Sequence, residues 1–300
     1  MIDASAIWDF WINVALPGID GALVRVLPEE WARHQFMRYA LIECVLLAPI
    51  CAAMGVKVVN FRMAFFSDAI SHSAFAGVAF GFLLNEIYAR FDPQIALIVF
   101  GVLIGLGIAF VRRETDLSHD TVIGVFFSTV VALGIAVITT SESRTQDFTP
   151  YLYGDILALG PADLALSAVL ALVVIVYMLF SFNRLALIGL NAELAHSRSV
   201  SVRLHDYLFS LLLALVVTAS IRTAGILLVT AMLIVPAATA RNVARSARSM
   251  FFWALAVGLV SGIAGAIASF SDLLDSVGTG AVIVLAAATL FTLSFFTRRS

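Results

Sequence analysis

The chain has few charged residues for its length and an unusual excess of apolar ones. Of its 300 residues, 13% are charged and 61% are hydrophobic, whereas a soluble domain averages about 25% charged and about 45–50% apolar residues. A soluble fold of this length cannot bury so much apolar surface, so the excess must face lipid. The mean hydropathy of +1.02 agrees with this. The sequence therefore predicts an all-α integral membrane protein, in contact with membrane lipid.

Other deficits exclude whole classes of function. The net charge of −2 argues against a polyanion binder, so no nucleic-acid partner is expected. The only lysine, Lys57, lies in the apolar stretch MGVKVV, and no G-x-x-x-x-G-K-S/T phosphate loop is present, so the chain is not expected to hydrolyse ATP itself. The two cysteines, Cys44 and Cys51, are seven positions apart in one apolar run. On a helix that spacing is about 10 Å, too far for a disulfide.

Nine segments are long and apolar enough to cross a bilayer, which takes about 20 residues per helix. Only a tight hairpin around Arg222 separates the sixth from the seventh, and counting these two as one gives the alternative of eight spans. Lysine and arginine favour the cytoplasmic side. With the N-terminus outside, twelve basic residues fall in inner loops and six outside, which predicts an outer N-terminus and a cytoplasmic C-terminus. The segments are 36–58, 63–85, 93–111, 121–140, 161–181, 204–221, 224–240, 250–270 and 278–296.

Residues 1–35 are too polar to cross the membrane. They contain Trp8, Trp11 and Trp31, and tryptophan prefers the membrane–water interface. The chain is therefore expected to have an extracytoplasmic or interfacial segment, 1–35, followed by a single transmembrane domain, 36–300.

The second segment carries an aspartate and a histidine, Asp68 and His72, in FFSDAISHSAF. A spacing of four places both side chains on one helix face, about 8 Å and about 13 Å into a hydrocarbon core about 30 Å thick. Titratable groups at that depth are costly and usually functional. Carboxylate and imidazole suit zinc, manganese or ferrous iron, but zinc wants about four ligands, so other helices, a second copy or water must complete the site. Alternatively, Asp68 caps the helix and His72 is a hydrogen-bonded core histidine.

A second acid, Glu43, lies in the first segment at comparable depth. Intramembrane acids are usually both buried and functional. Glu43 is therefore a candidate residue of a metal pathway, and the alternative is a hydrogen bond to an adjacent helix.

Five blocks, in order along residues 36–296, resemble the permease family of zinc/manganese/iron ABC importers. FRMAFFSDAISHSAFAGVAFGFLL resembles the family signature around its Asp and His, and HDTVIGVFFSTVVALGI resembles the block that follows. YLYGDILAL, AGILLVTAMLIVPAATAR and SVGTGAVIVL resemble three further elements. Together these matches cover most of the chain.

The resemblance implies a multi-pass permease of the inner cell membrane that forms a homodimer. It implies two cytoplasmic ATP-binding subunits and an extracytoplasmic metal-binding protein as partners, with no permanently bound cofactor. Zinc, manganese or iron would be the transported ion and would pass Asp68 and His72 near the dimer axis. The loop around Glu193, Ala195 and Ser199 resembles the segment that contacts the ATPase.

The sequence departs from the family pattern at several positions. Ser67 replaces the glycine before the signature aspartate, a glycine is usual near Ser199, and Glu43 falls where an apolar residue is expected. The alternative function is a secondary transporter or channel, driven by an ion gradient, in which Asp68, His72 and Glu43 relay protons.

Overall fold

The computed structural model describes residues 8–87, 92–140, 154, 156, 159–271 and 277–297. In these ranges the chain is helical, with turns between the helices and no strand. The elements are η1 (Trp11–Ala15), α2 (Leu16–Val26), α3 (Glu29–Ala32), α4 (Gln35–Asn60), α5 (Ala64–Ile87), α6 (Pro93–Glu114), α7 (His119–Thr140), α9 (Pro161–Leu190), α10 (Ala192–Ser197), α11 (Val202–Val243), α12 (Ala247–Ser269) and α13 (Thr279–Thr297).

Eight helices within the described ranges are long and apolar enough to cross a membrane. These helices are α4, α5, α6, α7, α9, α11, α12 and α13. Each of the nine predicted segments matches part of one of them to within one residue at its ends, and the sixth and seventh both lie in the 42-residue α11. The predicted all-α membrane class is confirmed. Four arginines used to predict the orientation, Arg90, Arg144, Arg298 and Arg299, lie outside the described residues, as do residues 1–7 of the N-terminal segment.

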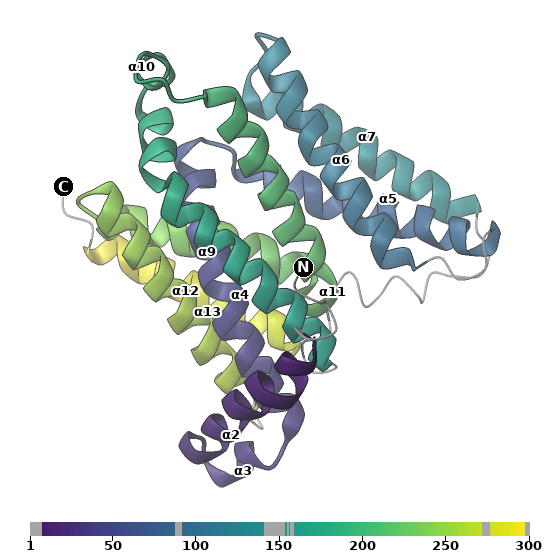
Figure 1. Cartoon of the computed structure of the whole chain (residues 1–300), viewed down its shortest axis with the longest axis vertical. Helices are drawn as coiled ribbons and strands as arrows, with labels where there is room; N and C mark the ends of the chain where they lie inside the picture. The colour runs from purple at the N-terminus through teal and green to yellow at the C-terminus, as the bar shows by residue number, and fades with distance from the viewer. Residues whose placement is uncertain are drawn as a thin grey trace.

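The long helices form two groups, and α11 contacts both. One group consists of α5, α6 and α7, and the other consists of α4, α9, α12 and α13 (Figure 1). The short α10 lies at one end of the bundle, and α2 and α3 lie at the opposite end (Figure 1).

Helix α11 consists of two helical stretches that meet at Gly225, where φ is 77° and ψ is 161°. Its first stretch runs antiparallel to α6. Near the start of α6, Arg222 Nη1 donates to Gln94 Oε1 at 2.8 Å, and further along, a Cβ built on Gly105 would lie 3.0 Å from Ala214 Cβ. Residue numbers therefore increase along α6 in the direction in which they decrease along the first stretch of α11.

The second stretch of α11 runs parallel to α4, which passes the junction near its own start, beside Thr223 at the end of the first stretch, and passes Leu233 of the second stretch near its own end. Thr223 Oγ1 donates to Glu43 Oε1 at 3.1 Å near the start of α4, and a Cβ on Gly55, near its end, would meet the Leu233 carbonyl at 1.8 Å. The starts of α4 and α6 both lie beside the junction at Gly225. The first stretch runs towards the start of α6 and the second runs away from the start of α4, so the chain reverses direction at the junction. No loop residue intervenes, and the reversal requires the positive φ that glycine adopts without strain.

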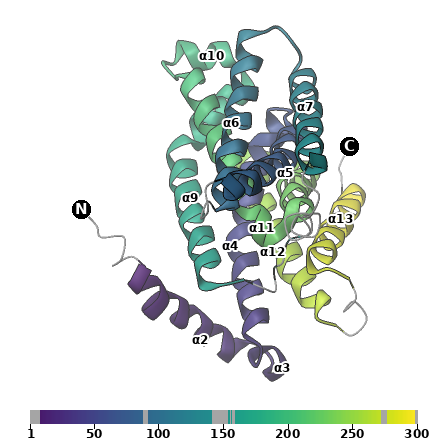
Figure 2. The same ribbon diagram turned by 90° about the vertical axis from the view of Figure 1, so that its right-hand side faces the viewer.

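The N-terminal helices attach to the end of the bundle where α9 begins (Figure 2). Arg38 Nε donates to Asp20 Oδ1 at 2.6 Å, and Trp11 Nε1 donates to the Pro161 carbonyl at 3.0 Å. These contacts hold α2 and η1 against the transmembrane helices. The predicted location at the membrane interface stays a prediction.

Candidate metal site

Asp68 and His72 lie one turn apart on α5, as their spacing predicts. His72 Nε2 is 3.8 Å from Asp68 Oδ1, and the two side chains are 37% and 38% exposed. The His72 ring packs edge-on against Phe127 of α7 with their centroids 5.0 Å apart. The two side chains are therefore partly exposed on the same face of α5.

The open face of α5 extends beyond the pair. Phe65, one turn earlier, is 63% exposed, whereas Ser67 and Ser71 are buried. Within the described ranges, no group of three or more His, Cys, Asp or Glu side chains could hold a metal ion. A single chain therefore brings together at this face two side chains of the kinds that bind metals, fewer than the four ligands that zinc prefers.

The alternative interpretation of the pair does not fit the helix. Asp68 is the fifth residue of α5, which begins at Ala64, so it does not occupy the N-cap position. His72 is more than a third exposed and its ring contact is with Phe127, so it is not a core histidine. Both side chains are instead displayed toward the surface of the single chain.

Glu43 lies in a separate polar cluster. Its side chain is completely buried, and its Oε1 accepts hydrogen bonds from Ser167 Oγ of α9 at 2.8 Å and Thr223 Oγ1 of α11 at 3.1 Å. The second oxygen, Oε2, is buried and has no hydrogen-bond partner. The hydrogen bonds to adjacent helices that the sequence left open as an alternative are therefore present, and they direct Glu43 to α9 and α11 and not to Asp68.

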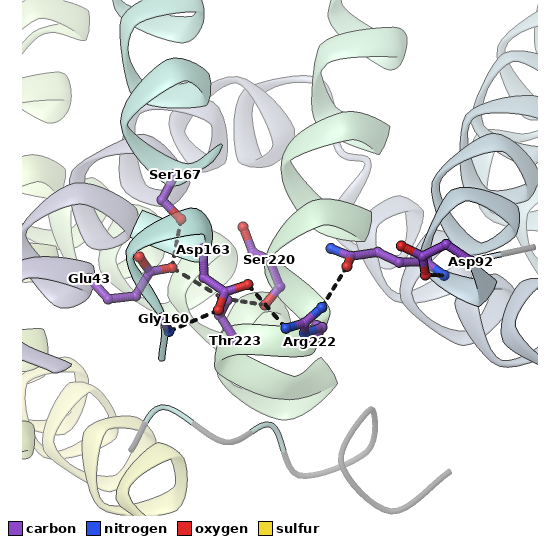
Figure 3. Close-up of polar contacts among 9 residues, drawn as sticks. Glu43, Asp92, Gly160, Asp163, Ser167, Ser220, Arg222 and Thr223 are labelled. Carbon is purple, nitrogen blue, oxygen red and sulfur yellow. Dashed lines mark hydrogen bonds and ion pairs between the residues drawn. The ribbon is translucent and has the colours of Figure 1, made fainter. Parts of the chain in front are cut away.

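A charged network lies next to this cluster (Figure 3). Asp163 accepts from the Gly160 backbone nitrogen at 3.0 Å and lies 3.4 Å from Arg222, which also donates to Gln94. The network joins the starts of α6 and α9 to the reversal of α11. The sequence singled out Arg222 as a hairpin residue and as one of the six outer basic residues, but not as part of a site. Asp163 was missed, and the available signal was its position three residues after Gly160, at a helix start.

The predicted ATPase-contacting loop is the short helix α10 with its flanks. The Asn191 side chain caps this helix by accepting from the Glu193 backbone nitrogen at 2.9 Å. Ala195 is buried, and its carbonyl accepts from the Val200 nitrogen at 3.0 Å. Glu193 and Ser199 are exposed, and Ser199 has a φ of 58°. Glycine adopts this conformation without strain, so the backbone here would suit the glycine that the resemblance leads us to expect.

The chain matches a known family of transport proteins over most of its length. The model of the ABC 3 transport family matches residues 33–298. The chain belongs to the ABC 3 transport family. The resemblance found from the sequence blocks is thereby confirmed, and the chain is a multi-pass cell-membrane protein. Residues 1–32 lie outside the match.

Individual relatives cover nearly the whole chain. It is 32% identical over 260 residues to the high-affinity zinc uptake system membrane protein ZnuB of Haemophilus influenzae, covering 86% of this chain and 96% of that protein. It is 34% identical over 268 residues to the manganese transport system membrane protein MntC of Halalkalibacterium halodurans, covering 89% of each. The solved structure of PsaBC from Streptococcus pneumoniae in complex with Fab matches with a TM-score of 0.75 and 31% identity, over 89% of this chain and 94% of that one.

Proposed function

We propose that this ABC 3 family member is the transmembrane subunit of an importer that moves a divalent transition metal into the cytoplasm. Zinc, manganese or iron is the cargo, and a separate ATPase subunit supplies the energy. The observation that carries the proposal is the Asp68–His72 pair on the open face of α5, with Nε2 and Oδ1 3.8 Å apart. The similarity to relatives named for zinc and manganese transport supports it.

The open face suits a site shared by two copies of the chain. A second copy facing the first would contribute its own carboxylate and imidazole, which gives the four ligands that zinc prefers. Nitrogen and oxygen donors also accept manganese and ferrous iron. In a homodimer whose two α5 helices face each other, the two pairs of side chains would therefore line one common passage for the ion.

The proposed topology has nine crossings with the N-terminus outside. Its support is the reversal at Gly225, which makes the two stretches of α11 run in opposite directions, antiparallel to α6 and parallel to α4. Nine is an odd number, so the C-terminus lies on the side opposite to the N-terminus, in the cytoplasm. The excess of arginine in the loops then assigned to the inside agrees with this orientation.

The ATPase subunit would dock at α10. Glu193 and Ser199 are exposed there, as is the apolar side chain of Leu194, which is 49% exposed. The Ala195 side chain is buried within the chain, so it would shape the loop and not touch the ATPase directly. An extracytoplasmic metal-binding protein on the opposite side and a cargo role for Glu43 stay predictions of the sequence.

A transport assay separates this function from the gradient-driven alternative. The permease is reconstituted into vesicles with its ATPase and metal-binding protein, and uptake of zinc, manganese and iron is measured with and without ATP. We expect uptake only with ATP and the ATPase. Uptake that persists without ATP and collapses with the ion gradients would establish the alternative.

A further inference from the structure

Among the described residues, no cationic side chain is paired with the buried carboxylate of Glu43. In the described part of the chain, the groups bonded to it are the neutral hydroxyls of Ser167 and Thr223. The nearby arginine, Arg222, pairs instead with Asp163. An uncompensated charge inside a membrane protein is very costly, so Glu43 must be neutralised either by a proton or by a bound cation.

Two hydroxyl groups contact one oxygen of this carboxylate (Figure 3). Ser167 Oγ and Thr223 Oγ1 lie 2.8 Å and 3.1 Å from Glu43 Oε1. Ser220 is 2% exposed and lies one turn before Thr223. The Thr223 hydroxyl donates to the Ser220 backbone carbonyl at 3.1 Å. Both Ser220 Oγ and Glu43 Oε2 are buried without a hydrogen-bond partner. Two buried oxygen atoms of this region are therefore without a partner, and an unsatisfied buried polar atom calls for an ion or a water to complete it.

The helix geometry adds negative potential at the same place. Thr223 lies two residues before Gly225, where the first stretch of α11 ends. The carbonyl end of a helix carries a partial negative charge that favours cations. Broken membrane helices use such ends, together with unwound backbone carbonyls, to coordinate Na⁺.

We propose that Glu43, Ser167, Ser220 and Thr223 bind a monovalent alkali cation, with Na⁺ as the fitting ion, at the reversal of α11. The donor set is all oxygen and contains no imidazole or thiolate, which suits a hard cation. One carboxylate and one monovalent ion give zero net charge, whereas a divalent ion would leave a buried positive charge. The site joins α4, α9 and α11, and it is distinct from the metal route at Asp68 and His72.

Direct binding tests the proposal on the full-length permease purified in detergent. We expect radioactive sodium to bind at about one ion per chain and to be displaced by unlabelled Na⁺. Glu43→Gln should abolish binding, and Ser220→Ala should weaken it by about tenfold, the loss expected for one oxygen ligand. Two matched controls should bind as the wild type does: Glu114→Gln, at an exposed glutamate, and Ser261→Ala, at a buried serine bonded to the Gly258 carbonyl.

Thermal unfolding gives a second measurement that does not depend on isotope binding. At constant ionic strength and pH, replacing choline by Na⁺ should raise the midpoint temperature of the wild type and leave that of Glu43→Gln unchanged. The amide keeps the side-chain shape and removes the charge, so this variant should fold in choline.

Three results would overturn the proposal. One is the absence of any Na⁺ or K⁺ effect on the wild type, which would leave a neutral, protonated Glu43. Another is Na⁺ binding that survives Glu43→Gln. The third is stabilisation through Glu43 by Mn²⁺ and not by Na⁺, which would make the cluster a cargo site.

Discussion

The backbone of Gly154 packs directly on the backbone of Gly225. A Cβ built on Gly154 would lie 2.3 Å from the Gly225 nitrogen and 2.4 Å from the Ala224 carbonyl carbon. Both glycines have positive φ, at 68° and 77°. They come from two separate blocks of the sequence that resemble the family, so the contact explains why each block contains a glycine: one turns the chain and the other covers the turn.

Gly154→Ala should therefore destabilise the permease. A methyl group would clash with backbone atoms, and the left-handed conformation alone costs about 1–2 kcal/mol for an alanine. We expect a lower midpoint of thermal unfolding in detergent and less folded dimer on gel filtration. Gly124→Ala is the matched control, because nothing lies within 4 Å of a Cβ built on that helical glycine. An unchanged midpoint for Gly154→Ala would contradict the packing described at the reversal.

Ser199 should tolerate glycine better than a branched residue. Its φ of 58° is favourable for glycine and strained for a β-branched side chain. We expect Ser199→Gly to retain the metal-stimulated ATP hydrolysis of the assembled transporter and Ser199→Val to lower it. Equal hydrolysis by the two variants would show that the backbone conformation after α10 does not matter for coupling.

The ion pair between Asp20 and Arg38 should hold the N-terminal helices to the bundle. The two side chains are 24% and 12% exposed, with Nε and Oδ1 2.6 Å apart. Breaking one partner of a largely buried pair is destabilising because the other charge is left unpaired. Asp20→Asn and Arg38→Gln should each lower the unfolding midpoint, and the double variant should lose less than the sum of the two.

The pair formed by Glu29 and Arg33 provides the control for this cycle. It is also an acid–arginine pair of the N-terminal region, but its side chains are 92% and 75% exposed, so Glu29→Gln should leave the midpoint unchanged. Additive effects of Asp20→Asn and Arg38→Gln would mean that the two residues act independently.

The sequence predicted the helices well because lipid imposes a minimum length of apolar residues. The first predicted span, 36–58, corresponds to α4 at Gln35–Asn60. The fifth, 161–181, was too short, since α9 continues to Leu190. Asn183 and Arg184 end the apolar run but not the helix, because a helix can project beyond the hydrocarbon core and carry polar side chains.

The site was only partly predictable, for a physical reason. Asp68 and His72 lie four residues apart, so helix periodicity alone places them together. The partners of Glu43 come from positions 124 and 180 residues later in the chain. Serine and threonine are common in membrane helices, where they can bond to the preceding turn, so nothing in the local sequence distinguishes Ser167 or Thr223 from their neighbours.

The most direct test of the proposed transport route is metal uptake by vesicles that contain the complete transporter with His72→Ala or Asp68→Ala in the permease. Loss of even an outer-shell partner costs about 10–100-fold in metal affinity, so loss of a ligand should lower uptake by at least about tenfold while the dimer still assembles. His34→Ala, at an exposed histidine outside the transmembrane helices, should transport as the wild type does. Normal uptake by both His72→Ala and Asp68→Ala would contradict the assignment of this pair to the metal route.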